Sequence, residues 1–476
     1  MSKPFTPRAY QRPMIDHILD LPRGALWAGL GTGKTVAALT AIDTLQLAGM
    51  REPALVLAPL RVAEHTWTNE TGKWDHLSGM DVSAIVGTPA QREAALRQVL
   101  RGEAGVGTIN YDNLPWLLEK LDGKWPFGMV VADESTRLKS FRGGFRTHPT
   151  SGKTYYQGGG GTRARALGRV AHKTERFVNL TGTPASNGLQ DLWGQQWFID
   201  AGQRLGRTHE AFIQRWFSKG HNGFSLEPLP FAEEQIHAAL SDVCLTVDIR
   251  DYYDIGEPVR STVEVELPAK ARALYRDMER KMFMELAGRE VEAVHAAAKT
   301  IKLLQICNGA AFVDEDSTVW EEIHDAKLQA LDSIVEEANG APVLVAYHFK
   351  PDLARLKRTF KHGIDLSTGE GLRRAMKGEG RVWFAHPMSL GHGVDGLQEH
   401  CNQIAFFGHW WSLENRQQII ERVGPTRQMQ AGKDRPVFVY DIIAADTVDE
   451  LVMERHETKR STQDILLAAM KRKKLI

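Results

Sequence analysis

Residues Ala28–Thr35 read AGLGTGKT and stand directly before a helix-like run rich in alanine, valine and leucine. A loop of small residues lets backbone N–H groups curl around phosphate oxygens, and the N-terminus of the following helix adds partial positive charge. In such a loop the Lys34 ammonium would reach the β- and γ-phosphates of a nucleoside triphosphate, and the Thr35 hydroxyl would ligate Mg²⁺. The sequence therefore predicts a phosphate-binding loop. Its backbone cradle would be Gly29, Gly31, Thr32 and Gly33.

Two adjacent carboxylates, Asp133 and Glu134, follow the apolar run Met129–Ala132 further along the chain. A phosphate loop needs a carboxylate at the end of a neighbouring strand to hold the metal. Asp133 would hold Mg²⁺, and Glu134 would orient and polarise the attacking water. Adjacent acids after a strand also occur as a charge pair at a helix N-terminus. The phosphate loop upstream favours the catalytic interpretation.

Phosphoryl transfer also needs positive charge to offset the charge that develops on the γ-phosphate, usually an arginine from a second body. The candidates are Arg422 and Arg427, in the segment ENRQQIIERVGPTRQ. The alternative interpretation of both is a solvated helix face.

Short apolar runs alternate with helix-period stretches such as Thr35–Leu47 and Pro89–Leu100, first over the N-terminal 190 or so residues and again near the C-terminus. This alternation predicts parallel sheets covered by helices on both faces, and hence two α/β lobes. The expected strands are Ala54–Pro59, Gly105–Tyr111, Met129–Glu134 and Phe177–Thr183, and then Val343–Phe349, Gly363–Thr368, Arg381–Pro387, Gln403–Gly408 and Val437–Ile443.

Between the two sets, Leu274, Met278, Met282 and Leu286 recur every four residues, which predicts a helix that is broken or bent near Gly288. We interpret this region as a bridging helical hairpin that packs on one lobe. The predicted division is an N-terminal lobe over residues 1–225, a bridging segment over 226–325 and a C-terminal lobe over 326–476.

The 476 residues carry 59 Lys+Arg and 59 Asp+Glu, so the formal net charge is zero and a uniformly basic nucleic-acid binder is excluded. Cys244, Cys307 and Cys401 form no CxxC pair, and the histidines show no metal-ligand spacing, so no disulfide framework or structural metal is expected. No apolar run is long enough to cross a bilayer, and the N-terminus has no apolar signal core. A cytoplasmic monomer is expected.

Charge is concentrated locally. Residues 137–176 contain ten Lys or Arg and one acidic residue, a local net charge of about +9. The Gly-rich insert at about 141–161 lies in this segment, and the glycine run Gly158–Gly161 predicts a flexible loop. Basic and aromatic residues together suit phosphate contact and base stacking, although a solvated surface loop is the alternative. The candidate contacts are Arg142, Arg146 and Lys153, with Phe141, Phe145, Tyr155 and Tyr156 interleaved.

Taken in order, these motifs resemble superfamily 2 helicases, and specifically the SWI/SNF-type DNA translocases in the compact form found in phages. Nearly the whole chain is covered. The matching segments are Tyr10-Gln11, which resembles the adenine-reading glutamine, AxxGxGKT at Ala28–Thr35, motif Ia at Leu55–Glu70, TINYDNL at Thr108–Leu114, DESTRLKS at Asp133–Ser140, LTGTPASN at Leu180–Asn187 (motif III), SLGHGVDGLQ at Ser389–Gln398 (motif V) and WSLENRQQIIERVGPTRQ at Trp411–Gln428 (motif VI).

The chain departs from the family pattern at three places. Thr136 stands where the DEAH box has histidine. Motif VI usually reads QxxxRxxRxGQ, and here Arg422 matches the first arginine, whereas Pro425 occupies the second position and Arg427 follows two residues later. The Asp395-Gly396 step in motif V is also unusual for the family.

The resemblance implies two RecA-like lobes with a helical insert and ATP, with Mg²⁺, bound between the lobes. It implies that Gln11 recognises the base. The residues that would couple the nucleotide state to DNA are Thr181, Gly182, Thr183, Gly391 and Gly393.

The implied activity is a DNA-dependent ATPase that tracks along duplex or branched DNA and remodels DNA or DNA–protein complexes, with a protein partner as a possible source of targeting. The alternatives are an RNA helicase of the wider superfamily and an ATP-gated nucleic-acid-binding scaffold without motor activity.

Overall fold

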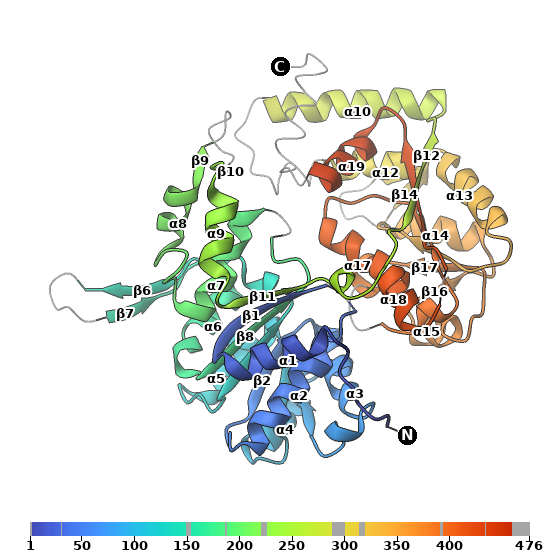
Figure 1. The fold of residues 1–476 in the computed structure, drawn as a ribbon. Coiled ribbons are helices and arrows are strands. Elements are labelled where there is room, and N and C mark those ends of the chain that lie inside the picture. The colour runs from blue at the N-terminus through green and yellow to red at the C-terminus, as the bar shows by residue number, and fades with distance from the viewer. Residues whose placement is uncertain are drawn as a thin grey trace. The chain divides into compact units, whose positions relative to one another are not determined.

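The computed structural model describes residues 2–29, 31–148, 154–185, 188–219, 226–287, 300–313, 319–390, 394–433 and 435–458. The chain forms two compact units, Met1–Asp254 and Ile255–Ile476 (Figure 1). Each unit is built around one parallel sheet. The two α/β lobes predicted from the alternating pattern are therefore confirmed, and the division at residues 225 and 325 stays a prediction.

Within the described residues, the first unit holds a seven-stranded sheet of order β11-β1-β8-β5-β2-β4-β3. All its pairings are parallel. Strands β2 and β5 are buried along their whole length, which is why they appear in the sequence as continuous apolar runs. The strands are β1 (Arg23–Ala28), β2 (Ala54–Ala58), β3 (Val82–Ala84), β4 (Val106–Asn110), β5 (Met129–Asp133), β8 (Arg176–Thr181) and β11 (Cys244–Val247).

Helices separate these strands along the chain and flank the sheet (Figure 1). Helix α4 shows how local sequence starts a helix: the Thr88 hydroxyl accepts from the Gln91 N–H, the Gln91 side chain accepts from the Thr88 N–H, and Pro89 takes the first position. The helices are α1 (Gln11–Asp20), α2 (Lys34–Leu47), α3 (Trp67–Thr71), α4 (Pro89–Leu100), α5 (Leu114–Leu121), α6 (Thr162–Gly168), α7 (Leu192–Asp200), α8 (His209–Trp216) and α9 (Ala232–Leu240).

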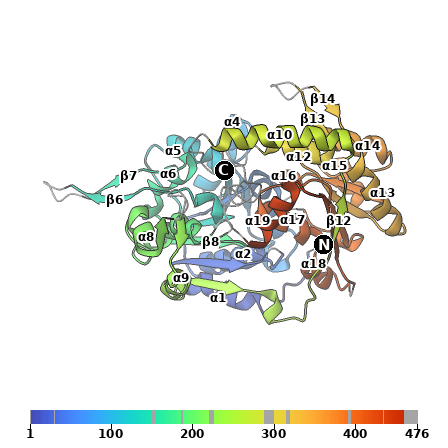
Figure 2. The same cartoon turned by 90° about the horizontal axis from the view of Figure 1, so that it is seen from above.

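Two antiparallel ribbons belong to the first unit. Strands β6 (Gly144–Thr147) and β7 (Thr154–Gln157) form one ribbon, which projects from the body of the unit (Figures 1 and 2). Strands β9 (Phe217–Lys219) and β10 (Leu226–Pro228) form the other.

The second unit holds, in its described part, a six-stranded parallel sheet of order β12-β19-β18-β15-β17-β16. Its strands are β12 (Val259–Val265), β15 (Val343–Ala346), β16 (Ile364–Asp365), β17 (Val382–Ala385), β18 (Gln403–Phe406) and β19 (Phe438–Ala444), beside the ribbon β13 (Ala310–Phe312) and β14 (Trp320–Glu322). Its helices are α10 (Ala269–Ala287), α12 (Ile301–Asn308), α13 (Ala326–Glu337), α14 (Lys350–Thr359), α15 (Gly369–Ala375), α16 (Pro387–Leu390), α17 (Leu413–Val423), α18 (Pro425–Gln430) and α19 (Val448–Thr458).

The helical signal of the bridging segment corresponds to α10 and α12, which share an apolar cluster with α19 in the second unit. The predicted break near Gly288 lies outside the described residues. The four-residue recurrence that predicted this helix does not coincide with its buried face, because Leu274 is 44% exposed whereas Tyr275 is 1% exposed. Four residues turn an α-helix by more than one full turn, so a strict four-residue spacing drifts off the buried face.

A buried polar network fixes the packing of the second unit. The Lys327 ammonium of α13 lies 2.6 Å from the Asp449 carboxylate of α19, and both side chains are 0% exposed. Lys327 also donates to Asn308 of α12, and the Asn308 amide donates to Asp352 of α14. Four helices are thus held in register by groups whose burial is tolerated because they are paired.

Across the described residues, we find no helix with both the length and the apolar character that crossing a membrane requires.

Candidate functional site

The predicted phosphate loop lies between β1 and α2 in the first unit. Gly31 and Gly33 both have φ of +80°, a backbone conformation that favours glycine. A Cβ atom on Gly33 would lie 2.3 Å from the Gln11 side-chain nitrogen. The positive φ therefore favours glycine at this position, which is the N-cap of α2.

The Lys34 side chain is buried against the inner side of this loop. Its Nζ donates to the carbonyls of Ala28 (2.7 Å) and Gly29 (3.0 Å). The Thr32 hydroxyl donates to the same Gly29 carbonyl (2.8 Å), which closes the turn. Thr35 follows on the first turn of α2 and is half-buried. The loop therefore presents an ammonium, a hydroxyl and a helix N-terminus in one place.

Gln11, the predicted base-recognising residue, contacts the loop. Its Nε2 donates to the Thr32 carbonyl (3.1 Å), and its Oε1 accepts the Arg8 backbone N–H (3.0 Å). An amide has a second hydrogen and a second lone pair, which is what the edge of a purine base needs.

The acidic pair lies at the carboxyl end of β5. The Asp133 carboxylate accepts a hydrogen bond from the Trp67 indole N–H at 2.9 Å, and the Tyr111 hydroxyl donates to the Asp133 carbonyl at 2.8 Å. Burial raises the pKa of Asp133, while the Trp67 hydrogen bond and the Lys34 charge oppose that rise. Glu134 has φ of +56°, a strained conformation for a residue with a side chain, as is common at functional sites.

The motif III segment stands between the phosphate loop and the acidic pair. Strand β8 lies between β1 and β5, with Thr181 paired to Trp27 and Leu180 paired to Asp133. The Thr181 hydroxyl accepts the Thr183 N–H at 3.2 Å across Gly182. Because all three strands are parallel, their carboxyl ends bring the predicted groups of the first unit to one edge.

The two predicted arginines lie in the second unit and bond to one short segment. The Arg422 guanidinium donates to the Val394 carbonyl at 2.8 Å. Arg427 forms an ion pair with Asp395 at 3.1 Å. Val394 thus holds Arg422, and Asp395 holds Arg427. Both residues follow the predicted coupling residues Gly391 and Gly393, which lie outside the described residues.

The part of the basic insert that the structure describes, residues 141–148 and 154–161, packs closely against its own backbone. The expectation of a flexible loop at Gly158–Gly161 is wrong, because the Arg142 N–H donates to the Gly159 carbonyl and a Cβ on Gly160 would come within 1.9 Å of the Ser140 carbonyl. Glycine serves here for close backbone approach rather than for flexibility.

Three of its aromatic residues are packed rather than available for base stacking. Phe141 is 0% exposed and lies 4.5 Å from Trp197, ring to ring. Phe145 stacks on the same Trp197, and Tyr156 contacts it. Tyr155 is 49% exposed.

Of the predicted DNA contacts, Arg142 donates to the carbonyls of Lys139 and Phe141 within its own turn. Arg146 on β6 donates to Gln157 on β7. Lys153 lies outside the described residues.

Comparison with known proteins identifies the family. A family model described as SNF2-related domain matches residues 21–144, which include the phosphate loop and the acidic pair. Protein p41 of Acyrthosiphon pisum secondary endosymbiont phage 1 is 53% identical over 478 residues, covering 99% of this chain and 100% of p41. The nuclear protein STH1/NPS1 of Saccharomyces cerevisiae and the DNA repair and recombination protein RAD54-like of Drosophila erecta are each 23% identical, over 91% and 92% of this chain. The chain belongs to the SWI/SNF family of ATPases.

This SWI/SNF chain spans 32% of the length of STH1/NPS1 and 59% of the length of the RAD54-like protein. The solved Sulfolobus solfataricus SWI2/SNF2 ATPase core in complex with dsDNA is 18% identical, covers 99% of this chain and 96% of that one, and superposes with a TM-score of 0.42.

Sequence reasoning missed the residues of this SWI/SNF chain that support the acidic pair. Trp67 lies within the motif Ia segment, but nothing in its spacing indicates a hydrogen bond to a carboxylate 66 positions away. Gln195 in α7 accepts a hydrogen bond from the Ser135 hydroxyl at 2.9 Å, but nothing in the segment LWGQQWFID distinguishes it from the adjacent Gln196.

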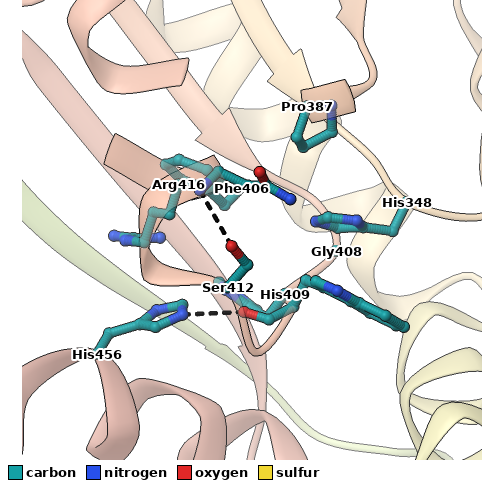
Figure 3. Close-up of a pocket in the computed structure, with 10 residues that line it drawn as sticks. His348, Pro387, Phe406, Gly408, His409, Ser412, Arg416 and His456 are labelled. Atoms are coloured by element: carbon teal, nitrogen blue, oxygen red, sulfur yellow. Dashed lines mark hydrogen bonds between the residues drawn. The ribbon is translucent and has the colours of Figure 1, made fainter. Parts of the chain in front are cut away.

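The second unit of the SWI/SNF chain also contains a small, partly open hollow whose lining includes His348, His409 and His456 (Figure 3). Burial lowers the pKa of His348 and His456 to about 3 and that of His409 to about 4. His456 bonds to the Trp410 carbonyl, and Ser412 accepts the Asn415 N–H. Among the described residues, no group of His, Cys, Asp and Glu has an arrangement that could hold a metal ion.

Proposed function

We propose that this chain is an ATP-driven motor that hydrolyses ATP when bound to duplex or branched DNA, moves along it, and remodels DNA or DNA–protein complexes. The observation that carries the proposal is the edge of the first sheet, where β1, β8 and β5 bring Lys34, Thr181 and the acidic pair side by side. Membership of the SWI/SNF family supports the same interpretation.

In this proposal Lys34 supplies positive charge to the phosphates, and Gln11 recognises the base while bracing the loop. The Thr35 hydroxyl and the Asp133 carboxylate are oxygen donors of the kind that Mg²⁺ prefers, so this donor set fits the ion. Bound Mg²⁺ would neutralise charge on the phosphate oxygens. Glu134 orients and deprotonates the attacking water.

The second unit would supply the compensating cation. Arg422 is the first candidate because it matches the motif VI position, and Arg427 is the second. The Asp395 carboxylate fixes the direction of the Arg427 guanidinium. We propose that closing on ATP and opening after hydrolysis moves the DNA contacts of one lobe past those of the other, which gives directional stepping.

The DNA track would include the basic segment and its projecting ribbon. Arg146 and Tyr155 lie on adjacent strands of this ribbon, which the packed Phe141 anchors. The salt slope is the slope of the logarithm of the binding constant against the logarithm of the salt concentration. Each phosphate contact that is removed reduces the magnitude of this slope by about one. We expect Arg146→Ala to reduce the salt slope, and Tyr155→Ala to weaken branched or single-stranded DNA most. Arg101→Ala, at an exposed helix end, is the control. Unchanged slopes in the ribbon variants would mean that the ribbon is a solvated surface element.

ATP hydrolysis measured without polymer and with duplex DNA, single-stranded DNA or RNA tests the central proposal. We expect the strongest stimulation with duplex DNA and no hydrolysis in Lys34→Ala. Stimulation by RNA alone would identify an RNA helicase, and absence of hydrolysis in every condition would identify an ATP-gated scaffold. Displacement of a third strand from a triplex then distinguishes translocation from strand separation.

A further inference from the structure

Helix α7 carries a fully buried amide directly behind the proposed catalytic edge. Gln195 is 1% exposed, and the other residues from Leu192 to Ile199 are buried with it. Burying an amide costs free energy unless its polar atoms are bonded, and leucine would fill a similar volume at no such cost. The amide is therefore expected to hold specific partners.

Both ends of the Gln195 side chain are bonded. Its Oε1 accepts the Ser135 hydroxyl at 2.9 Å. Its Nε2 donates to the Pro184 carbonyl at 2.8 Å and to the Asp191 carbonyl at 3.0 Å. The Gln195 carbonyl also accepts the Asn179 amide of β8 at 2.9 Å, which fixes α7 against that strand.

These partners are the immediate neighbours of two functional segments. Ser135 follows Glu134, and Pro184 follows Thr183. One side chain thus bonds the acidic pair's turn to the end of motif III. Displacing either segment breaks a buried hydrogen bond unless the other segment moves with it.

Thr136, the neighbour of Ser135, does not make this connection. Along the part of the chain that the structure describes, the Thr136 side chain makes no hydrogen bond to residues 181–184. Thr136 is 4% exposed and occupies the histidine position of the DEAH box. The connection instead starts at Ser135 and is completed by Gln195 of α7.

We propose that Gln195 is a positioning residue that couples the acidic pair to motif III, so that DNA engagement accelerates ATP hydrolysis through Ser135, Gln195 and Pro184. This inference rests on the proposed function. It places the coupling in side chains that do not touch the nucleotide.

The test compares Gln195→Leu with Gln196→Leu in the full chain. Gln196 is the next residue of α7, is 2% exposed, and faces Cys244 of β11 instead. The kcat and KM for ATP are measured with and without saturating duplex DNA, beside the thermal unfolding midpoint. For Gln195→Leu we expect the ratio of DNA-stimulated to basal kcat to fall about 10-fold while KM stays within about 2-fold. Gln196→Leu keeps the wild-type ratio.

Ser135→Ala provides an independent measurement, because it removes the other end of the bond with almost no change in volume. We expect it to lower the ratio in the same direction, and the Ser135→Ala/Gln195→Leu double variant to lose no more than the more impaired single variant. If Gln195→Leu does not fold, the ratio in Ser135→Ala decides.

A wild-type ratio in folded Gln195→Leu, or in Ser135→Ala, overturns the coupling role. Equal losses in Gln195→Leu and Gln196→Leu would also overturn it, since they would indicate a packing effect of α7. A wild-type protein that shows no polymer stimulation would instead contradict the proposed function, so the two failures are distinguishable.

Discussion

The indole of Trp67 offers a way to test whether Asp133 is the metal-holding carboxylate. Trp67 is 0% exposed and donates one hydrogen bond to Asp133 at 2.9 Å. The substitution Trp67→Phe removes that donor and keeps an aromatic ring. It leaves every proposed contact to nucleotide and metal in place.

The expected size of the effect follows from the charge and burial of the pair. A hydrogen bond to a charged group contributes about 1.5–3 kcal/mol, which corresponds to about 10- to 150-fold in an equilibrium constant. Without the indole N–H, burial raises the pKa of Asp133 further, so the carboxylate remains protonated to higher pH. We therefore expect Trp67→Phe to need about 10- to 150-fold more Mg²⁺ for half-maximal hydrolysis. We also expect the acid limb of its pH–rate profile to move to higher pH.

The assay is ATP hydrolysis with saturating DNA over a Mg²⁺ titration at several pH values. Trp74→Phe is a matched control, because the Trp74 indole donates to the Glu70 carboxylate at the same distance, 2.9 Å, outside the site. The thermal unfolding midpoints of both variants show how much the smaller phenylalanine ring destabilises the fold. An unchanged Mg²⁺ requirement and acid limb in folded Trp67→Phe would refute the role of this bond, and with it the assignment of Asp133.

Three further outcomes concern stability. Gly160→Ala should destabilise the first unit by clearly more than the roughly 1–2 kcal/mol that an alanine costs in the left-handed conformation. The control is Gly123→Ala, which is also at positive φ but has open space around it, so denaturant unfolding should show that cost alone. Burial lowers the pKa of His409 in the folded state to about 4, below its ordinary value of 6.5, so the stability present above pH 6.5 is lost as the pH falls toward 4. At pH 5 we expect a loss of about 2 kcal/mol, and we expect His409→Gln to show a flatter pH dependence of the unfolding midpoint. Lys327→Met leaves the Asp449 carboxylate buried without its partner and should lower the free energy of unfolding by about 3–5 kcal/mol. The double variant Lys327→Met/Asp449→Asn removes the buried charge and should recover part of this loss. Equal unfolding midpoints for the single and double variants would show that the unpaired carboxylate is not the cause of the loss.

Much of the fold could be predicted from the sequence because buried parallel strands appear as continuous apolar runs. Strands such as Ala54–Ala58 and Val343–Ala346 are buried on both faces, so every residue is apolar. The phosphate loop was also predictable, because two of its glycines, Gly31 and Gly33, have positive φ, which favours glycine at these two positions.

The rest depended on contacts between distant segments. The Trp67 bond to Asp133 and the Gln195 bond to Ser135 arise only when the sheet brings their elements together. Composition misled at Gly158–Gly161, because glycine permits close packing as readily as flexibility. Phe141 of the insert is a core residue that packs beside Trp197, and not a residue available for base stacking.

The ion pair between Asp395 and Arg427 changes the meaning of two oddities in this chain. Judged one position at a time, an acid in motif V and a displaced arginine in motif VI count as two defects. In the folded second unit they are partners at 3.1 Å. Chimeras that exchange motif V or motif VI with a relative should therefore transfer both residues together. Transferring one alone would create a mismatch that neither parent contains.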